Sequence, residues 1–151
     1  MEENFVESPR QWSMLFLAWV ISLVAMLGSL FFSEVMEFPP CVLCWYQRIC
    51  MYPLVLILFI SLLKTKTGYL LNSMSLGLIG WCIALYHNLL YYEILPHSSS
   101  PCQRGISCTS VHIEWLGFIT IPLLSLVAFS LILLILGFNL RFETLEKKHE
   151  V

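Results

Sequence analysis

The sequence predicts an all-α integral membrane protein, a bundle of four transmembrane helices that forms a single domain over residues 1–151. Hydrophobic residues make up 58% of the chain and charged residues only 12%, whereas soluble domains carry roughly a quarter charged residues. The apolar residues are also gathered into four long runs. Each run reaches the ~20 residues that a helix needs to cross a bilayer, and a helix satisfies its own backbone groups where lipid cannot.

The four predicted helices follow these runs in order. The first and fourth contain no charged residue, the second contains only Arg48, near its start, and the third contains only the titratable His87. A cleaved signal peptide is a poor interpretation of the first run, because no strong basic flank precedes it and no small-residue cleavage site follows it. The helices are predicted at about residues 13–32, 45–63, 69–92 and 115–140.

The basic residues predict how the bundle is oriented. Six Lys and Arg residues lie in the two tails or between the second and third helices, and only Arg104 lies in the other two loops once Arg48 is assigned to its helix. Because cytoplasmic loops carry the excess of positive charge, both termini are predicted to be cytoplasmic. Loops 33–44 and 93–114 then face outward. No basic stripe indicates a nucleic-acid partner.

Four of the six cysteines lie in the outward loops, where disulfides persist. They allow three pairings, of which the spacing favours Cys41 with Cys44 and Cys102 with Cys108, since each of these pairs is local. A two-residue C-x-x-C ring is a poor structural staple, because stabilisation grows with the size of the closed loop. Such rings are typical of exchangeable dithiols, so a redox role is the favoured interpretation.

Other roles for the cysteines are less favoured. A closed zinc site needs four ligands, and no second C-x-x-C or pair of histidines accompanies the motif, so no metal site is predicted. Haem attachment would need histidine after Cys44, where the chain has Trp45. Cys50 and Cys82 lie inside predicted helices and are interpreted as small apolar packing residues.

The position of the C-x-x-C motif indicates an activated thiol. Pro39 and Pro40 keep the chain extended up to Cys41, so the second helix is expected to begin close to Cys44. Unpaired N–H groups and the helix dipole would lower the pKa of the Cys44 thiol there. Arg48, four residues on and about 6 Å further along the same face, would favour that thiolate and an anion on a bound acceptor. The alternative is that Arg48 snorkels to the lipid head groups.

The position of the dithiol and the lack of nucleotide-binding motifs indicate the kind of electron acceptor. The chain has no G-x-G-x-x-G and no P-loop, so an acceptor reached from the membrane surface should itself be lipid-soluble. A quinone fits this description. His87 lies near the outer end of the third helix among Tyr86, Tyr91 and Tyr92, and is interpreted as a packing or interface residue.

Residues 40–48, P-C-V-L-C-W-Y-Q-R, open the second predicted helix. With the second outward cysteine pair and the run G-F-I-T-I-P at 117–122, this motif resembles the signature of the DsbB/BdbC disulfide-bond-formation family over essentially the whole chain. The five residues between Cys102 and Cys108 resemble the BdbC branch. The proteobacterial branch has a much wider separation, so a transfer from Cys108 to Cys41 is not carried over from it.

The resemblance implies a thiol:disulfide oxidoreductase of the bacterial cell membrane that depends on a quinone, menaquinone or ubiquinone. It would reoxidise an extracytoplasmic thioredoxin-like thiol oxidase, of the DsbA or BdbD kind, and so support disulfide bond formation in exported proteins. The implied role of Cys102 is to be attacked by the partner's thiolate, and that of Cys108 is to resolve the complex.

The resemblance also implies roles around the C-x-x-C motif. Cys41 and Cys44 would take the electrons, Cys44 would face the quinone ring with Arg48 beside it, and His87 matches a histidine often placed near the quinone. Two alternatives are weighed against this function. One is a quinone reductase of the vitamin K epoxide reductase type, in which the C-x-x-C would precede a later helix. The other is a membrane scaffold with structural disulfides, whose potentials usually lie below about −300 mV.

Overall fold

A computed structural model describes residues 9–37, 40–63, 67–94 and 120–149. These residues form four long helices and no strand, which confirms the predicted all-α bundle. All four are long and apolar enough to cross a membrane. The helices are α1 (Pro9–Leu30), α2 (Val42–Leu63), α3 (Thr67–Tyr91) and α4 (Ile121–His149), and a π-helical segment, η1 (Phe31–Val35), continues α1.

The helix ends differ from the predicted ones where polar residues extend an apolar run. Helix α1 begins at Pro9, because proline suits the first helical position, where the N–H has no helical partner. Helix α4 continues past the predicted end to His149. Its described part begins after Thr120, whose Oγ1 accepts a hydrogen bond from the N–H of Leu123 at 3.4 Å. The predicted start at residue 115 lies outside the described residues.

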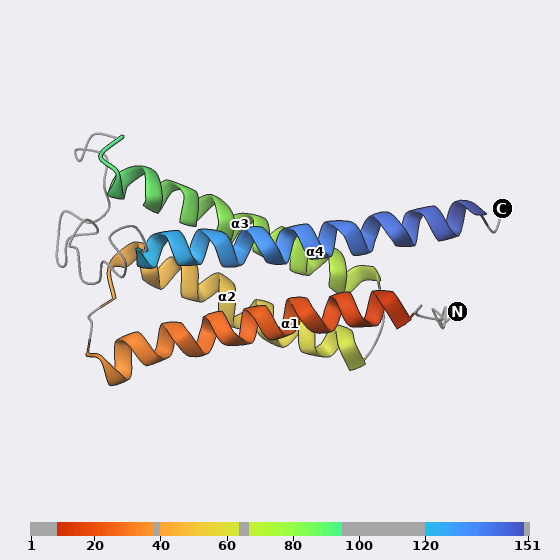
Figure 1. The fold of residues 1–151 in the computed structure, drawn as a ribbon, viewed down its shortest axis with the longest axis horizontal. Helices are drawn as coiled ribbons and strands as arrows, with labels where there is room; N and C mark the ends of the chain where they lie inside the picture. Colours follow the sequence, from red (N-terminus) through yellow and green to blue (C-terminus); the bar gives the residue numbers. More distant parts are fainter. Residues whose placement is uncertain (1–8, 38–39, 64–66, 95–119, 150–151) are drawn as a thin grey trace.

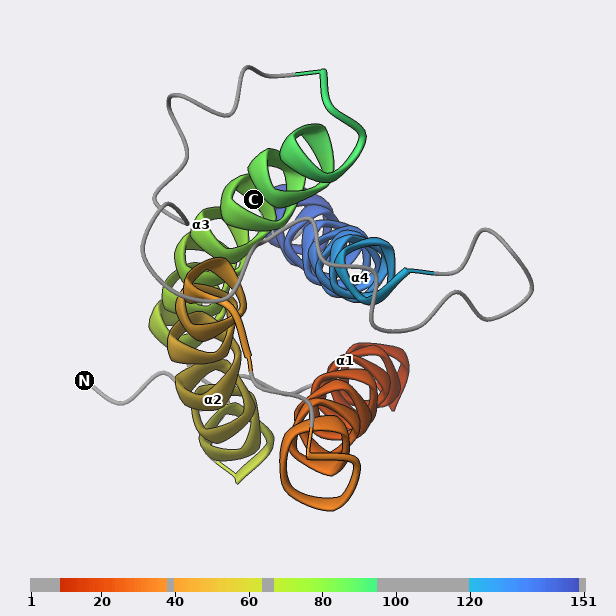
Figure 2. The same ribbon diagram turned by 90° about the vertical axis from the view of Figure 1, so that its left-hand side faces the viewer.

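The helices form an antiparallel ring. Contacts join α1 to α2, α2 to α3, α3 to α4, and α4 back to α1. Figure 2, viewed along the bundle, shows the four helices around a common axis. Figure 1 shows the start of α1 and the end of α4 at one end of the bundle, while the start of α2, the end of α3 and the start of α4 lie at the other. This second end is where the C-x-x-C motif lies.

The bundle is apolar both inside and outside. Its core contains Leu54, Leu58, Ile132 and Leu136, none of them exposed to solvent. The outer faces also carry large hydrophobic side chains. More than half of the surface of Val24, Leu56, Leu78 and Leu134 is exposed. A helix that is apolar on every side suits a lipid environment and not water, so the burial pattern agrees with a multi-pass membrane protein.

Small residues on α3 let α4 approach closely. A Cβ atom added at Gly77 would lie 3.1 Å from Cδ2 of Leu133, and one added at Gly80 would collide with the ring of Phe129. Near the site, Nδ2 of Asn88 donates to the carbonyl of Pro122 at 2.8 Å. Close packing of small residues is a principal source of helix association in membranes. These contacts between α3 and α4 therefore hold the start of α4 beside the end of α3.

Gly80→Ala is expected to destabilise the protein. The new methyl group meets the buried ring of Phe129, and overpacking of this kind typically costs about 1–3 kcal/mol. The matched control is Gly137→Ala on α4, where nothing lies within 4 Å of the added Cβ. Thermal unfolding in detergent should show a lower Tm for Gly80→Ala than for the control. An equal or higher Tm would contradict the packing described for α3 and α4.

Candidate redox site

The first cysteine of the C-x-x-C motif, Cys41, directly precedes helix α2. The carbonyl of Cys41 accepts the first helical hydrogen bond, from the N–H of Trp45 at 3.1 Å. The Sγ atom of Cys41 accepts a second, from the N–H of Cys44 at 3.4 Å. Cys41 is therefore the N-cap of α2, with its sulfur in the place usually taken by a serine or aspartate oxygen.

This geometry corrects the predicted helix start and the predicted activated thiol. The sequence placed the start close to Cys44, but α2 includes Val42 and Leu43. Two consecutive prolines are disfavoured in a helix interior but proline is tolerated up to the first turn, so the helix begins directly after Pro40 and Cys41. The sulfur that receives an N–H from the helix terminus is that of Cys41.

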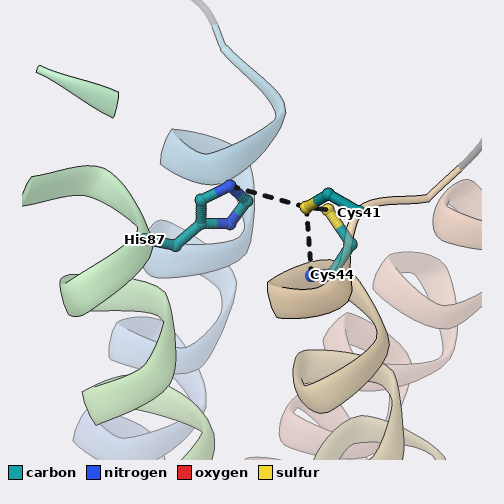
Figure 3. A group of neighbouring side chains, drawn as sticks. All are labelled: Cys41, Cys44 and His87. Atoms are coloured by element: carbon teal, nitrogen blue, oxygen red, sulfur yellow. Dashed lines mark hydrogen bonds between the residues drawn. The ribbon is translucent and has the colours of Figure 1, made fainter. Parts of the chain in front are cut away.

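The dithiol lies against a histidine from α3. The Sγ atoms of Cys41 and Cys44 are 2.9 Å apart, and Nε2 of His87 lies 3.8 Å from Sγ of Cys41. Figure 3 shows the imidazole pointing across from α3 to the two sulfurs at the start of α2. Cys41 is 8% exposed and His87 only 1%, whereas Cys44 is partly exposed. The fold thus joins a buried imidazole to a dithiol that is distant in sequence.

Gln47 holds the imidazole from the other side. Its Nε2 atom lies 3.1 Å from Nδ1 of His87, and its side chain is buried. An amide N–H donated to Nδ1 leaves the ring proton on Nε2, which then faces the sulfur of Cys41. No role for Gln47 was predicted from the sequence. The available signal was its position three residues after Cys44, which places it on the same helix face.

The surroundings favour the thiolate of Cys41, which precedes the spanning segment Val42–Leu63. The hydrogen bond from the Cys44 thiol is the largest influence that lowers the pKa of Cys41. The hydrogen bond of His87 and the N–H of Cys44 lower this pKa further, while burial raises it. The pKa of Cys41 is therefore well below its ordinary value, and the thiolate is the nucleophilic form.

His87→Ala is expected to slow alkylation of Cys41 in acid. In the native dithiol, Cys41 should react with iodoacetamide at about pH 6, where an ordinary thiol is protonated. Removal of His87 takes away a hydrogen bond that lowers the Cys41 pKa. Each unit by which the new pKa exceeds the pH of the assay lowers the thiolate fraction, and with it the rate, about tenfold. Mass spectrometry that locates the modified cysteine measures the rate.

Cys82→Ala is the control for this experiment, because Cys82 is exposed on α3. At a pH above the ordinary cysteine pKa, Cys41 should react at similar rates in His87→Ala and the native protein. An unchanged pH profile in His87→Ala would show that the imidazole does not influence Cys41.

Arg48 is anchored inside the bundle. Its Nε donates to Oγ of Ser29 at 2.9 Å and its Nη2 donates to the carbonyl of Ser29 at 2.8 Å. The guanidinium carbon lies 5.6 Å from the centroid of the Trp45 ring, and the residue is 9% exposed. The guanidinium thus bonds to α1, one turn of α2 beyond Cys44, instead of reaching for the head groups as the snorkelling interpretation supposes.

The remaining cysteines and His87 show where the sequence interpretation needs correction. Cys50 packs in the core, as predicted. The prediction for Cys82 is wrong, since its side chain is exposed. It lies two residues from both Gly80 and Ala84, hence on the opposite side of α3 from the packed face. Of the two interpretations of His87, packing is confirmed and the lipid interface is wrong, because the residue lies inside the bundle against Cys41.

The second cysteine pair cannot be placed beside the first. Cys102, Cys108 and most of the predicted outward loop 93–114 lie outside the described residues. Their roles, and the pairing of all four cysteines, stay predictions. The expected absence of a closed zinc site also stays a prediction, although Cys41, Cys44 and His87 bring three potential ligand atoms within 4.8 Å of one another.

The fold and the site together define a class. A C-x-x-C dithiol with a favoured thiolate, at the end of a four-helix membrane bundle, is the arrangement of a membrane thiol–disulfide oxidoreductase. The chain belongs to the disulfide bond formation protein DsbB family, whose model matches residues 10–139. The resemblance drawn from the sequence is thereby confirmed.

Individual relatives agree with this assignment. The chain is 48% identical over 122 residues to disulfide bond formation protein C of Bacillus subtilis (strain 168), covering 80% of this chain and 87% of that protein. It is 48% identical over 116 residues to the probable disulfide formation protein C of Halalkalibacterium halodurans, covering 76% and 84% respectively. It is 42% identical over 137 residues to the SPbeta prophage-derived disulfide bond formation protein B of B. subtilis, covering 90% and 89%. No solved structure matches the chain.

Membership of this family establishes the general function of the protein. The protein is a membrane disulfide oxidoreductase that supports disulfide bond formation.

Proposed function

We propose that this protein is a quinone-dependent thiol:disulfide oxidoreductase of the bacterial cell membrane. It reoxidises an extracytoplasmic thioredoxin-like thiol oxidase, of the DsbA or BdbD kind, and thereby supports disulfide bond formation in exported proteins. The observation that carries the proposal is the Cys41–Cys44 dithiol at the end of α2, with a favoured thiolate and a buried imidazole beside it.

Electrons pass through the chain by disulfide exchange. The partner's two thiols are oxidised to a disulfide while the Cys102–Cys108 disulfide is reduced. Cys102 and Cys108 then return to the disulfide as the Cys41–Cys44 disulfide is reduced. Each exchange breaks one disulfide and forms another through a mixed disulfide. Finally Cys41 and Cys44 would give up two electrons as their disulfide re-forms, and a quinone would take up these electrons together with two protons.

The surroundings of the dithiol fit a lipid-soluble acceptor. Cys44 is partly exposed, and the Trp45 side chain beside it is 53% exposed on the apolar exterior of the bundle. Arg48 places a fixed positive charge on the same face of α2. A quinone, menaquinone or ubiquinone, supplies a two-electron acceptor that reaches this face from lipid. Arg48 would stabilise negative charge developing there, and His87 would hold a proton close to Cys41.

The proposal is tested with purified protein, a reduced thioredoxin-like protein and a quinone, under anaerobic conditions. Oxidation of the thioredoxin-like protein should require both the membrane protein and the quinone, with one quinol formed for each disulfide. Cys44→Ala should abolish quinol formation, while the matched control Cys82→Ala should leave it unchanged. Oxidation that proceeds equally well without quinone would contradict quinone dependence.

Both termini are proposed to be cytoplasmic, with the cysteine loops outside. The six-to-one distribution of basic residues supports this orientation. A membrane-impermeant thiol reagent applied to intact, reduced cells should therefore label the native cysteines of the outward loops. Thr144→Cys, in the exposed last part of α4, is the control, and its new thiol should react only after the cells are opened. If only the introduced thiol is labelled in intact cells, the proposed orientation is wrong.

A further inference from the structure

We propose that the reduced protein binds a thiophilic d¹⁰ cation, Zn²⁺ or Cd²⁺, at a three-ligand site formed by Cys41, Cys44 and His87. The three side chains come from the start of α2 and the end of α3, and their ligand atoms lie within 4.8 Å of one another (Figure 3). Two sulfurs and one imidazole nitrogen are the donor types that such ions prefer. A fourth position would stay open for water or another ligand, since the three groups occupy only one side of the ion.

The distances require only small adjustments. Bonds of about 2.3 Å from zinc to sulfur and about 2.0–2.1 Å to nitrogen, at tetrahedral angles, separate two sulfurs by roughly 3.8 Å and a sulfur from a nitrogen by roughly 3.6 Å. The sulfurs of Cys41 and Cys44 are 2.9 Å apart, and Nε2 of His87 is 3.8 Å from the Cys41 sulfur. Rotation of the partly exposed Cys44 side chain would lengthen the first distance, and the ligand atoms of all three residues lie within 4.8 Å of one another.

The charges balance at a buried position. Cys41 and His87 are almost fully buried, where an uncompensated divalent ion would be costly. Two thiolates neutralise the ion. Because Cys41 already favours the thiolate, binding releases the proton of the Cys44 thiol, with no electron transferred. The guanidinium of Arg48 makes its hydrogen bonds to Ser29 on α1, so it does not occupy the position of the ion between the sulfurs and the imidazole.

Gln47 supplies the outer shell. A histidine that ligates through Nε2 carries its proton on Nδ1 and usually donates it to a carbonyl or carboxylate oxygen. The amide of Gln47 lies 3.1 Å from Nδ1 of His87. A half-turn of that amide presents Oε1 as the acceptor, so Gln47 can serve both the free and the metal-bound imidazole.

The site exists only in the reduced state. In the Cys41–Cys44 disulfide neither sulfur is a thiolate, so the cation would compete directly with oxidation of the dithiol. Inhibition of quinone-dependent turnover is therefore expected, and this consequence rests on the proposed function. The binding itself does not depend on it.

Cd²⁺ alone serves as the probe, through its sulfur-to-metal charge-transfer absorption. The full chain carries Cys102→Ala and Cys108→Ala, so that the other cysteine pair does not contribute. The reduced protein should bind one Cd²⁺ per chain, and the same protein oxidised to the Cys41–Cys44 disulfide should bind none. His87→Ala should weaken binding tenfold or more and Gln47→Leu on the order of tenfold, whereas Cys50→Ala and Cys82→Ala should not change it.

Equal binding by oxidised and reduced protein would overturn the proposal, and so would unchanged affinity in His87→Ala. The comparison of redox states uses one folded chain, so it does not depend on any variant folding. Cd²⁺ binding as described, with no quinone reaction in the untreated protein, would retain the metal site and reject the proposed function. If the quinone reaction proceeds at the same rate with Cd²⁺ bound, the cation does not inhibit turnover, and that consequence is rejected.

Discussion

Cys102→Ala is expected to abolish oxidation of the thioredoxin-like partner, and Cys108→Ala is expected to trap the partner in a covalent complex. Exchange passes through a mixed disulfide, which persists when the thiol that resolves it is absent. The complex should therefore form through Cys102 and should be visible as a band on non-reducing gels that disappears on reduction. These two variants have the largest expected effect, because each removes an atom that forms a bond in the relay.

The control for the Cys102 and Cys108 variants is the state of the first pair. In Cys102→Ala, Cys41 and Cys44 should still be reducible by a small thiol, because their disulfide needs only access to a nucleophile. Cys50→Ala should behave as the native protein, since Cys50 packs in the core. A covalent complex formed through Cys41 in the absence of both Cys102 and Cys108 would contradict the proposed order of the relay.

Arg48→Leu is expected to lower kcat/KM for the quinone on the order of 100-fold. Removal of one donor that stabilises a developing anion typically costs this much or more. Arg48→Lys keeps the charge but loses the planar fork that bonds both Oγ and the carbonyl of Ser29, so an intermediate loss is expected. Steady-state quinol formation at varied quinone concentration measures both variants.

Ser29→Ala separates the charge of Arg48 from its anchor. This variant removes the Oγ acceptor on α1 but keeps the guanidinium and the Ser29 carbonyl that it bonds. If kcat/KM for the quinone falls only slightly in Ser29→Ala but strongly in Arg48→Leu, the effect comes from the charge of Arg48. Equal losses in both would make Arg48 a structural link between α1 and α2. Unchanged quinone kinetics in Arg48→Leu would remove Arg48 from the site.

The sequence was sufficient for the bundle because each helix is encoded locally. Apolar runs of membrane-spanning length specify α1 to α4 without reference to their partners. The C-x-x-C motif is equally local, so Cys41 and Cys44 could be recognised as a dithiol from their spacing. The error lay in the helix start, because residues 40–41 are compatible both with a loop and with the cap of a helix.

The contacts between helices could not be read from local patterns. The approach of His87 to Cys41 depends on how α3 is rotated against α2, and a run that is apolar on all sides does not specify that rotation. The bond from Gln47 to His87 depends on the same packing. Arg48 is another case, since its acceptor Ser29 lies on α1. The exposure of Cys82 depends on packing too, because the contact of Gly80 with Phe129 sets which side of α3 faces the bundle.

The central claim is that the Cys41–Cys44 dithiol passes its electrons directly to a quinone. The most direct test is an anaerobic single turnover with the reduced Cys102→Ala, Cys108→Ala protein and a slight excess of quinone. One quinol should form per chain, with loss of the Cys41 and Cys44 thiols and retention of those of Cys50 and Cys82. Quinone that stays oxidised while Cys41 and Cys44 remain thiols would contradict the claim.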